Sequence, residues 1–288
     1  MTARRSTLAA LVRATRPLAH GNIAPPILYG QALAFALTHH FSWTALVLAQ
    51  AFGVVDHLLI VFANDYADRE ADVLQTSPTP FSGGSRVLPD GELSPSTIRS
   101  LAIGAAIALL VLSMFISVWL GLAAIALIGA YSYPPLRLSY RGGGELLQGL
   151  GVGVVLPLVG LTAQGATIDA RVISYLAPTF VLGVAGNVLT SLPDEEPDRA
   201  ARKRSPAARW GGRSARGISM GLHAIGIALG WALLPLGPVA TLVCVVAVVP
   251  QVAARKRLDP SATLAFVVLG GLTETIAIVG WSIALVLT

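Results

Sequence analysis

The chain has 288 residues, of which 54% are hydrophobic and only 12% are charged, and its formal net charge is +5. A soluble domain carries about 25% charged residues, so this composition excludes a mostly water-facing surface and indicates an integral membrane protein. The positive charge does not indicate nucleic-acid binding, because no soluble domain carries the basic residues and no aromatic side chains are interleaved with them.

The N-terminal segment begins with basic residues, as a signal peptide does. However, Arg13, Arg16 and Pro17 interrupt any apolar core, and no cleavage signature follows. We therefore expect the first apolar segment to remain as a membrane span.

Nine apolar stretches follow along the chain, each about as long as a bilayer-crossing helix. They are continuously apolar rather than alternating, which indicates helices instead of a β-barrel. Their ranges are 20–38, 43–65, 97–114, 117–133, 144–164, 172–192, 216–234, 238–253 and 262–286. The pattern predicts an all-α membrane protein of about nine transmembrane helices that forms a single domain over residues 1–288.

Two carboxyl side chains lie inside predicted spans. Asp56 is in the second stretch, about two helical turns before Asn64, and Glu274 is in the last stretch. Carboxylates within a membrane are costly and usually face a cavity or a polar partner. Each is therefore expected either to line a cavity or to be buried, neutral and hydrogen-bonded.

A first acidic cluster ends the second stretch. If the helix continues at 100° per residue, four oxygen-bearing side chains between residues 64 and 72 share one face of the helix. The Glu70 side chain points away from that face. Stacked carboxylates repel each other unless a cation lies between them, and Mg²⁺ commonly binds one or two carboxylates together with substrate phosphates. The alternative is a solvated helix end paired with Arg69. The residues that share the face are Asn64, Asp65, Asp68 and Asp72.

A second acidic cluster follows the sixth stretch. Asp194 and Asp198 are four residues apart, Pro193 and Pro197 make a straight helix less certain there, and Lys203 lies in the basic segment downstream. Taken alone, this segment also fits a charged loop that obeys the positive-inside rule.

The two clusters together are more specific than either alone. Both follow an even-numbered span, four helices apart, in a weak internal repeat of two four-helix units plus one helix. Opposed acidic clusters can hold Mg²⁺ around a diphosphate and neutralise the leaving group as its charge develops. Arg and Lys side chains supply charge-assisted hydrogen bonds to phosphate oxygens.

The basic residues also predict the orientation. With the N-terminus in the cytoplasm, every one of the 20 Lys and Arg residues except Arg171 falls on the cytoplasmic side. The longest connecting segments, 66–96, 193–215 and 132–143, lie on that side too, so functional residues are expected there.

At these residues the sequence resembles the UbiA superfamily of intramembrane prenyltransferases. Its first motif, N-D-x-x-D-x-x-x-D, is complete at 64–72, and its second, D-x-x-x-D, is met at 194–198 with Lys203 following. The segment 131–137, Y-S-Y-P-P-L-R, is similar to the family's Y-S-x-P-P-x-R/K, and 142–145 is similar to its Gly-rich stretch. Arg16-Pro17 is similar to its Arg-Pro pair in the first helix.

The resemblance implies a helical bundle around a central cavity that opens to the cytoplasm. It also implies Mg²⁺ as cofactor, a polyprenyl diphosphate as donor, a small aromatic acceptor, and lipid around the protein. The implied metal-binding and catalytic residues are Asn64, Asp68, Asp72, Asp194 and Asp198, and Tyr131 is implied in catalysis as a lining residue where an allylic cation forms. The implied substrate-binding residues are Arg16, Asp65, Ser132, Tyr133, Arg137 and Lys203.

Within the superfamily, the segment 81–91, F-S-G-G-S-R-V-L-P-D-G, resembles the menaquinone branch, whose acceptor is 1,4-dihydroxy-2-naphthoate. Members of that branch often have N-x-R-D before the second acidic pair, whereas this chain has S-L-P-D at 191–194. The resemblance places the protein in a bacterial or archaeal cell membrane. Three alternatives stay open: transfer to another aromatic acceptor, a membrane terpene cyclase, and a membrane transporter with cavity acids.

Overall fold

The computed structural model describes residues 7–255 and 262–287. Every regular element within these ranges is helical. Four basic residues used for the orientation, Arg4, Arg5, Lys256 and Arg257, lie outside the described residues. The all-α prediction is therefore confirmed for the part of the chain that the structure covers.

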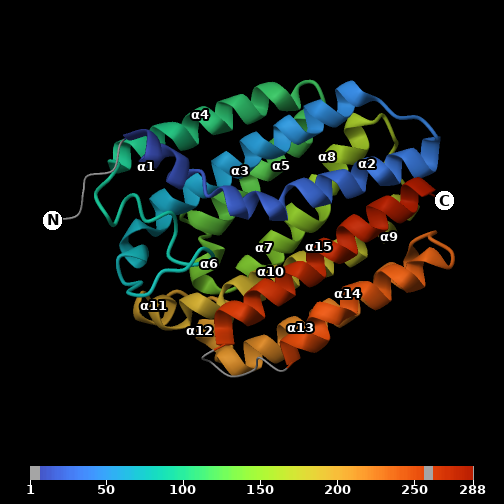
Figure 1. Cartoon of the computed structure of the whole chain (residues 1–288). Helices are drawn as coiled ribbons and strands as arrows, with labels where there is room; N and C mark the ends of the chain where they lie inside the picture. The colour runs from blue at the N-terminus through green and yellow to red at the C-terminus, as the bar shows by residue number, and fades with distance from the viewer. Residues whose placement is uncertain (1–6, 256–261, 288) are drawn as a thin grey trace.

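The elements of the first half lead from a short amphipathic helix into the bundle (Figure 1). They are α1 Thr7–Ala14, η1 Pro17–Asn22, α2 Ala24–Thr38, α3 Trp43–Asp72, α4 Pro95–Ser113, α5 Val118–Ser132, α6 Leu138–Arg141, α7 Gly144–Leu150, η2 Gly151–Val155 and α8 Leu156–Ala163.

The second half repeats the alternation of long helices and polar connections. Its elements are α9 Ala170–Tyr175, α10 Ala177–Thr190, η3 Leu192–Asp194, α11 Glu195–Ala200, α12 Pro206–Trp210, α13 Gly212–Leu233, α14 Val239–Arg255 and α15 Thr263–Leu287.

Each of the nine predicted apolar stretches coincides with a helical segment. Within the described residues, five segments are long and apolar enough to cross a membrane, namely 43–72, 95–113, 144–163, 170–200 and 263–287. Their outer surfaces carry large exposed apolar side chains such as Ile107, Leu272 and Ile283, which suits contact with lipid. The chain is thus an integral membrane protein, and the count of nine spans stays a prediction.

Local sequence explains where several helices begin. Ser42 and Ser94 are N-cap residues whose hydroxyls accept hydrogen bonds from the backbone of Ala45 and Thr97. The Asp169 carboxylate caps α9 in the same way, 2.8 Å from the Val172 nitrogen.

The helix predicted over 144–164 contains one π-helical turn, η2. Pro157 has no N–H, so it cannot donate the hydrogen bond that the Gly153 carbonyl would receive in a regular α-helix. The Thr179 hydroxyl of α10 donates to that carbonyl instead, at 2.6 Å. The irregular turn faces the interior, where Gly151, Val152 and Val155 line a cavity.

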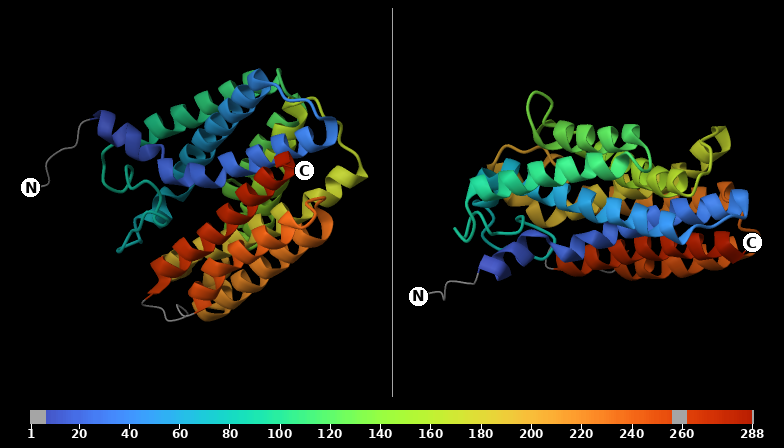
Figure 2. Two further views of the ribbon diagram at one scale, coloured as in Figure 1. Left: turned by 45° about the vertical axis from the view of Figure 1, so that its right-hand side comes forward. Right: turned by 90° about the horizontal axis from the view of Figure 1, so that it is seen from above.

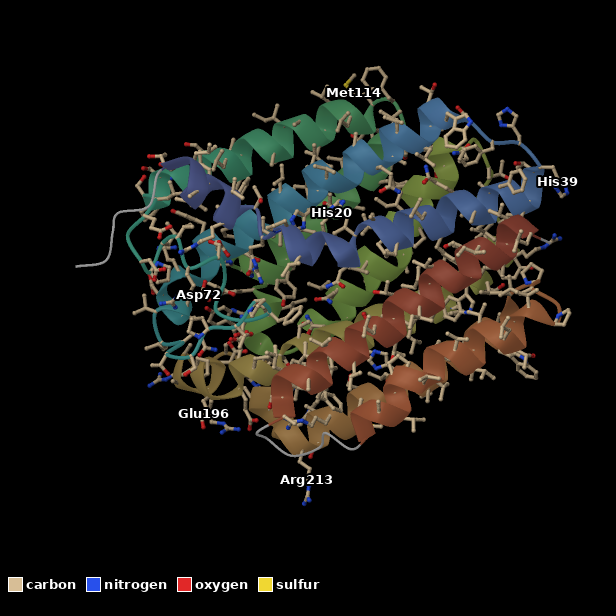
Figure 3. All side chains as sticks on the ribbon, in the orientation of Figure 1. His20, His39, Asp72, Met114, Glu196 and Arg213 are labelled. Atoms are coloured by element: carbon tan, nitrogen blue, oxygen red, sulfur yellow. The ribbon has the colours of Figure 1, made fainter. Side chains whose placement is uncertain are left out.

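The two ends of the bundle differ in character, as the turned views in Figure 2 also show. The polar end, as we call it, holds the connecting segments 73–94, 133–143 and 191–211, and the opposite end holds short turns at 39–42, 114–117, 164–169 and 234–238. Asp72 and Glu196 lie at the polar end and His39 at the opposite end (Figure 3). The long segments therefore gather at one end of the molecule.

Candidate active site

The first acidic cluster lies on α3, which continues as a helix through Asp72. Asp65 and Asp68 are each only 3% exposed, whereas the Glu70 side chain is 88% exposed and pairs with Arg69. Asn64 donates a hydrogen bond of 3.2 Å to Asp68 Oδ2. The face predicted from helical geometry is therefore the face that α3 turns inward.

The second acidic cluster is carried by a 3₁₀ turn and a short helix rather than one straight helix. Asp194 ends η3, and Asp198 is buried in α11. Gln75, just beyond α3, donates through Nε2 to Asp194 Oδ1 at 2.8 Å and to the Pro193 carbonyl at 3.2 Å. This amide links the two clusters directly.

Lys203 joins the clusters a second time. Its Nζ lies 2.9 Å from Asp68 Oδ2 and 3.7 Å from Asp198 Oδ1. Burial alone would lower the pKa of Lys203, but the carboxylates of Asp68 and Asp198 raise it well above its ordinary value. The two carboxylates therefore favour the charged form of the ammonium group.

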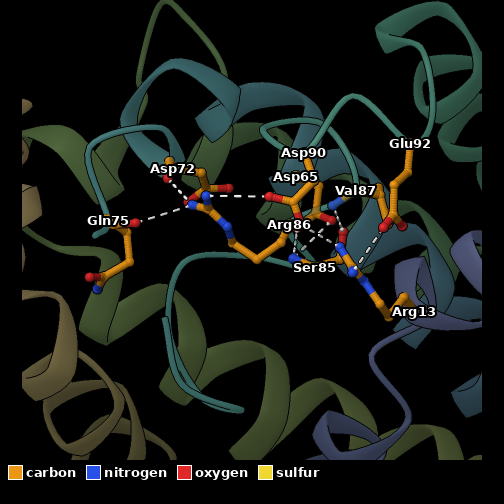
Figure 4. Close-up of polar contacts among 9 residues, drawn as sticks. All are labelled: Arg13, Asp65, Asp72, Gln75, Ser85, Arg86, Val87, Asp90 and Glu92. Atoms are coloured by element: carbon orange, nitrogen blue, oxygen red, sulfur yellow. Dashed lines mark hydrogen bonds and ion pairs between the residues drawn. The ribbon is translucent and has the colours of Figure 1, made fainter. Parts of the chain in front are cut away.

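The loop 73–94 covers the first cluster. Gly84 has a φ of +63°, and a Cβ there would clash with Asp72 Oδ2 and lie 3.0 Å from Asp65 Oδ1. The Ser85 nitrogen donates to both Asp65 oxygens at 3.3 Å, and Arg86 donates to the Asp72 carbonyl (Figure 4). The backbone of the loop thus packs directly against the carboxylates.

The N-terminal segment holds the loop from the other side. Arg13 forms ion pairs with Asp90 and Glu92 at 2.9 and 3.1 Å (Figure 4). Arg16, in a left-handed conformation with φ 45°, places its guanidinium 3.8 Å from Asp65 Oδ1. The loop is therefore tied to α1 as well as to α3, and Arg16 ties the segment before η1 to α3.

The segment after α5 contributes one lining residue and several supporting residues. Tyr131 lines the cavity, and its hydroxyl accepts a hydrogen bond from Asn187 at 3.4 Å. Ser132 is buried, whereas Tyr133 and Arg137 donate to the carbonyls of Ala63 and Ala67 on α3 at 2.9 and 3.3 Å.

Four of the predicted substrate-binding residues thus do not line the described cavity. Tyr133 and Arg137 donate hydrogen bonds to α3, Asp65 accepts from the loop, and Ser132 is buried. Their assignment to substrate binding stays a prediction.

A cavity of about 330 Å³ opens between the two clusters. Apolar side chains such as Ile60, Ile128 and Val155 line its interior, and the amides of Gln148 and Asn187, hydrogen-bonded to each other at 2.8 Å, form part of its wall. The predicted site residues that line it are Arg16, Asn64, Asp68, Asp72, Tyr131, Asp194, Asp198 and Lys203.

The donor atoms suit Mg²⁺. Oxygens of carboxylates and amides are the ligands that Mg²⁺ prefers, and Asp68 Oδ1 is buried with no hydrogen-bond partner among the described residues. No three His, Cys, Asp or Glu side chains in 7–255 and 262–287 form a group that could hold a metal by themselves. The carboxylate and amide oxygens at the cavity therefore suit a hard divalent cation such as Mg²⁺.

The two intramembrane carboxyl groups differ in environment. Asp56 lines the main cavity. Glu274 is outside it and lies 2.9 Å from His223 Nε2. Of the two environments expected for carboxyl groups inside predicted spans, Glu274 has the hydrogen-bonded one and Asp56 the cavity-lining one.

Sequence reasoning missed Gln75, Arg86 and Asn187. A signal existed for Gln75, because it follows Asp72 by three residues and would lie at about 20° on the same helical face. Arg86 and Asn187 act across tertiary contacts, for which spacing along the chain gives no signal.

The chain is similar to proteins of one family. The profile described as UbiA prenyltransferase family matches residues 23–269. A 1,4-dihydroxy-2-naphthoate octaprenyltransferase from Mycobacterium tuberculosis is 30% identical over 260 residues, covering 88% of this chain and 87% of that protein. A lycopene elongase/hydratase from Corynebacterium glutamicum is 27% identical over 225 residues, covering 76% and 75%.

Solved structures have the same fold. A UbiA homologue from Archaeoglobus fulgidus bound to GPP and Mg²⁺ has a TM-score of 0.71 at 19% identity, covering 97% of this chain and all (100%) of that one. The apo structure of a UbiA homologue from Aeropyrum pernix has a TM-score of 0.69 at 17% identity, covering 93% and 97%.

Proposed function

Because the chain belongs to the UbiA prenyltransferase family, we propose that it transfers a polyprenyl group from its diphosphate to 1,4-dihydroxy-2-naphthoate. Family membership makes the chain an enzyme, so the transporter alternative is set aside. The observation that supports the reaction best is the link that Lys203 makes between two acidic clusters at one cavity.

The polar end of the cavity would bind the diphosphate. Asn64, Asp68, Asp72, Asp194 and Asp198 would hold Mg²⁺. When bound, Mg²⁺ neutralises charge on the diphosphate as it leaves.

Lys203 and Arg16 would donate charge-assisted hydrogen bonds to phosphate oxygens. Lys203 now neutralises Asp68 and Asp198, and a bound diphosphate would compete for its ammonium group. Both side chains are held in place before substrate arrives, which reduces the reorganisation needed during the reaction.

The rest of the cavity would hold the two organic groups. Its apolar side chains exclude water from the allylic cation that remains when the C–O bond to diphosphate breaks. Tyr131 would present its ring to that cation, and the electron-rich acceptor ring would then attack it. As the new C–C bond forms on 1,4-dihydroxy-2-naphthoate, the bond from the ring to its carboxylate would break and carbon dioxide would leave. The loop 73–94 would limit the access of water from the polar end.

The acceptor is proposed from two sequence similarities. The segment 81–91 resembles the menaquinone branch, and a relative that covers most of the chain is named for 1,4-dihydroxy-2-naphthoate. A second candidate acceptor is a carotenoid, because two relatives are named lycopene elongase/hydratase. A terpene cyclase reaction would use the same ionisation without any acceptor.

One assay matrix separates these reactions. Detergent-solubilised protein is incubated with Mg²⁺, polyprenyl diphosphates of several lengths, and 1,4-dihydroxy-2-naphthoate, 4-hydroxybenzoate, lycopene or no acceptor. Pyrophosphate release and product masses are measured. We expect a prenylated naphthoquinol product and little product with 4-hydroxybenzoate. A prenylated carotenoid alone, or a cyclic terpene without acceptor, would contradict the proposed acceptor while keeping the ionisation step.

A further inference from the structure

Asp56 is a buried carboxyl group without a partner at the side of the cavity remote from the acidic clusters. It lies in the interior of α3, is 4% exposed and lines the cavity. Eight residues separate it from Asn64, which corresponds to about 12 Å along the helix at roughly 1.5 Å per residue. It is therefore too far along the helix to share the diphosphate site.

The other buried carboxyl groups all have partners. Asp65 accepts from Ser85, Asp68 from Asn64 and Lys203, and Glu145 from Arg209, and Asp198 lies near Lys203. Among residues 7–255 and 262–287, no group forms a hydrogen bond or ion pair with Asp56. Even its neighbour His57 is engaged elsewhere, with Nε2 2.6 Å from the Thr15 carbonyl.

An isoprenoid chain in the cavity could not form a hydrogen bond with the Asp56 carboxyl. The side chains that line the cavity around it include Ile23, Ile60 and Leu156, and an apolar ligand would leave the carboxyl without any hydrogen bond in a membrane interior, which is costly. A ligand with a hydroxyl group would remove that cost. Of the two substrates, only a hydroxylated acceptor carries one.

We infer that Asp56 accepts a hydrogen bond from a ring hydroxyl of the acceptor and thereby orients the ring between itself and the diphosphate. The inference rests on the proposed function. Asp56 precedes Asp68 by 12 residues of α3, about 18 Å along the helix at roughly 1.5 Å per residue, and the acceptor ring, the reacting allylic carbon and the Mg²⁺-bound diphosphate would occupy that length in this order. Asp56 would then select acceptors that donate a hydrogen bond at this position.

The test compares Asp56→Leu and Asp56→Asn with the wild type. Leucine has the same number of side-chain heavy atoms, branched at the same carbon, and suits an apolar interior, so Asp56→Leu should keep the wild-type melting temperature in detergent. We expect its KM for the hydroxylated acceptor to rise about tenfold, as loss of a buried hydrogen bond predicts. Asp56→Asn retains an accepting oxygen and should recover part of the loss. Glu70→Gln, on the exposed face of the same helix, is the matched control and should behave as wild type.

Two further measurements make the result specific. The KM of the donor and the slow acceptor-independent release of pyrophosphate should be unchanged in Asp56→Leu, which a merely structural role would not predict. An O-methylated acceptor should bind the wild type about tenfold more weakly than the free hydroxyl compound, and Asp56→Leu should no longer distinguish the two.

The inference would be overturned if the wild type and Asp56→Leu distinguished the O-methylated acceptor from the free hydroxyl compound to the same extent. It would also be overturned if the acceptor KM of Asp56→Leu stayed within twofold of the wild-type value. If the wild type itself releases no pyrophosphate with Mg²⁺ and donor, the proposed function fails instead. The two failures are therefore distinguishable.

Discussion

Asp68 is the residue at which the two acidic clusters meet. Its Oδ2 accepts hydrogen bonds from Asn64 on its own helix and from Lys203 in a distant part of the sequence. Its Oδ1 is buried and has no hydrogen-bond partner among the described residues. One oxygen thus fixes the orientation of the carboxylate while the other stays available to a cation.

Replacing Asp68 or Asp198 by Asn should therefore lower turnover strongly. Each change removes a negative charge while nearly keeping the shape. Loss of one group that stabilises transition-state charge typically costs about 10²–10³ in turnover, roughly 2.7–4 kcal/mol. The measurement is pyrophosphate release at saturating donor across a Mg²⁺ titration.

The double variant provides the sharper test. Groups that act as a unit are not additive, so Asp68→Asn with Asp198→Asn should be little worse than either single change. Glu70→Gln should keep most of the activity because its side chain faces solvent. Near-normal turnover and Mg²⁺ dependence in both single variants would mean that the clusters are only solvated helix ends.

Helical geometry was enough to predict which residues of the first cluster share a face. The 100° step per residue separated Asp68 from Glu70, and burial in the structure agrees with that separation. It was not enough for Tyr133 and Arg137, whose hydrogen bonds to α3 carbonyls depend on how α5 and α6 pack. The family resemblance pointed to Tyr133 and Arg137 as site residues but did not predict which groups they contact.

At the scale of elements, the site depends on α3 and on the loop that follows it. The 30 residues of α3 span about 45 Å at roughly 1.5 Å per residue, which exceeds the ~30 Å hydrocarbon core. Its last turns therefore extend to the membrane surface, where the loop 73–94 folds back over Asp65 and Asp72.

Gly84→Ala should consequently impair the reaction. Its φ of +63° disfavours a side chain, and the added Cβ would meet Asp72 Oδ2 and Asp65 Oδ1. The loop would have to move away from the acidic cluster. We expect acceptor-independent and acceptor-dependent release of pyrophosphate both to fall at least about tenfold, since a misplacement of about 1 Å can cost 10²-fold.

Gly91→Ala is the matched control for backbone strain. Gly91 lies in the same loop with a φ of +67°, but a Cβ there would have no neighbour within 4 Å. It should cost about 1–2 kcal/mol of stability from its left-handed backbone and leave turnover nearly unchanged. Equal losses in the two variants would show that strain, not contact with the carboxylates, explains the effect of Gly84→Ala.

Hydropathy predicted the positions of the helices well but not their irregularities. The π turn at 151–155 requires both the missing N–H of Pro157 and the hydroxyl of Thr179 from another helix. The first condition is visible in the sequence, and the second is a tertiary contact. Pro193 and Pro197 indicated that no straight helix continues from η3 into α11. The sequence did not predict that the first part would be a 3₁₀ turn.

At the scale of the whole molecule, the topology follows from the way in which successive helices run from one end of the bundle to the other. The segments 73–94 and 191–211 lie at the polar end, with helices over 95–113, 118–132, 144–163 and 170–190 between them. The even number returns the chain to the same side of a membrane. The turn at 164–169 follows three of these helices, which leads to the opposite side.

Labelling of single cysteines should reveal this topology. In a Cys244→Ala background, which removes the one native cysteine, cysteines replace the exposed residues Thr76, Thr167 and Glu196. The positive-inside rule places the polar end in the cytoplasm. A membrane-impermeant maleimide should therefore label position 167 in intact cells, and positions 76 and 196 only in inside-out vesicles.

Permeabilised membranes supply the control, since all three positions should label there and each variant should keep its activity. Opposite labelling of 76 and 196 would contradict the four intervening crossings and hence the nine-span arrangement. Inverted labelling of all three would keep the arrangement and reverse the orientation. The expected pattern would place the acidic clusters on the cytoplasmic side. A charged diphosphate would then reach Lys203 without crossing the membrane. The apolar wall of the same cavity would bind the isoprenoid chain, which partitions into lipid.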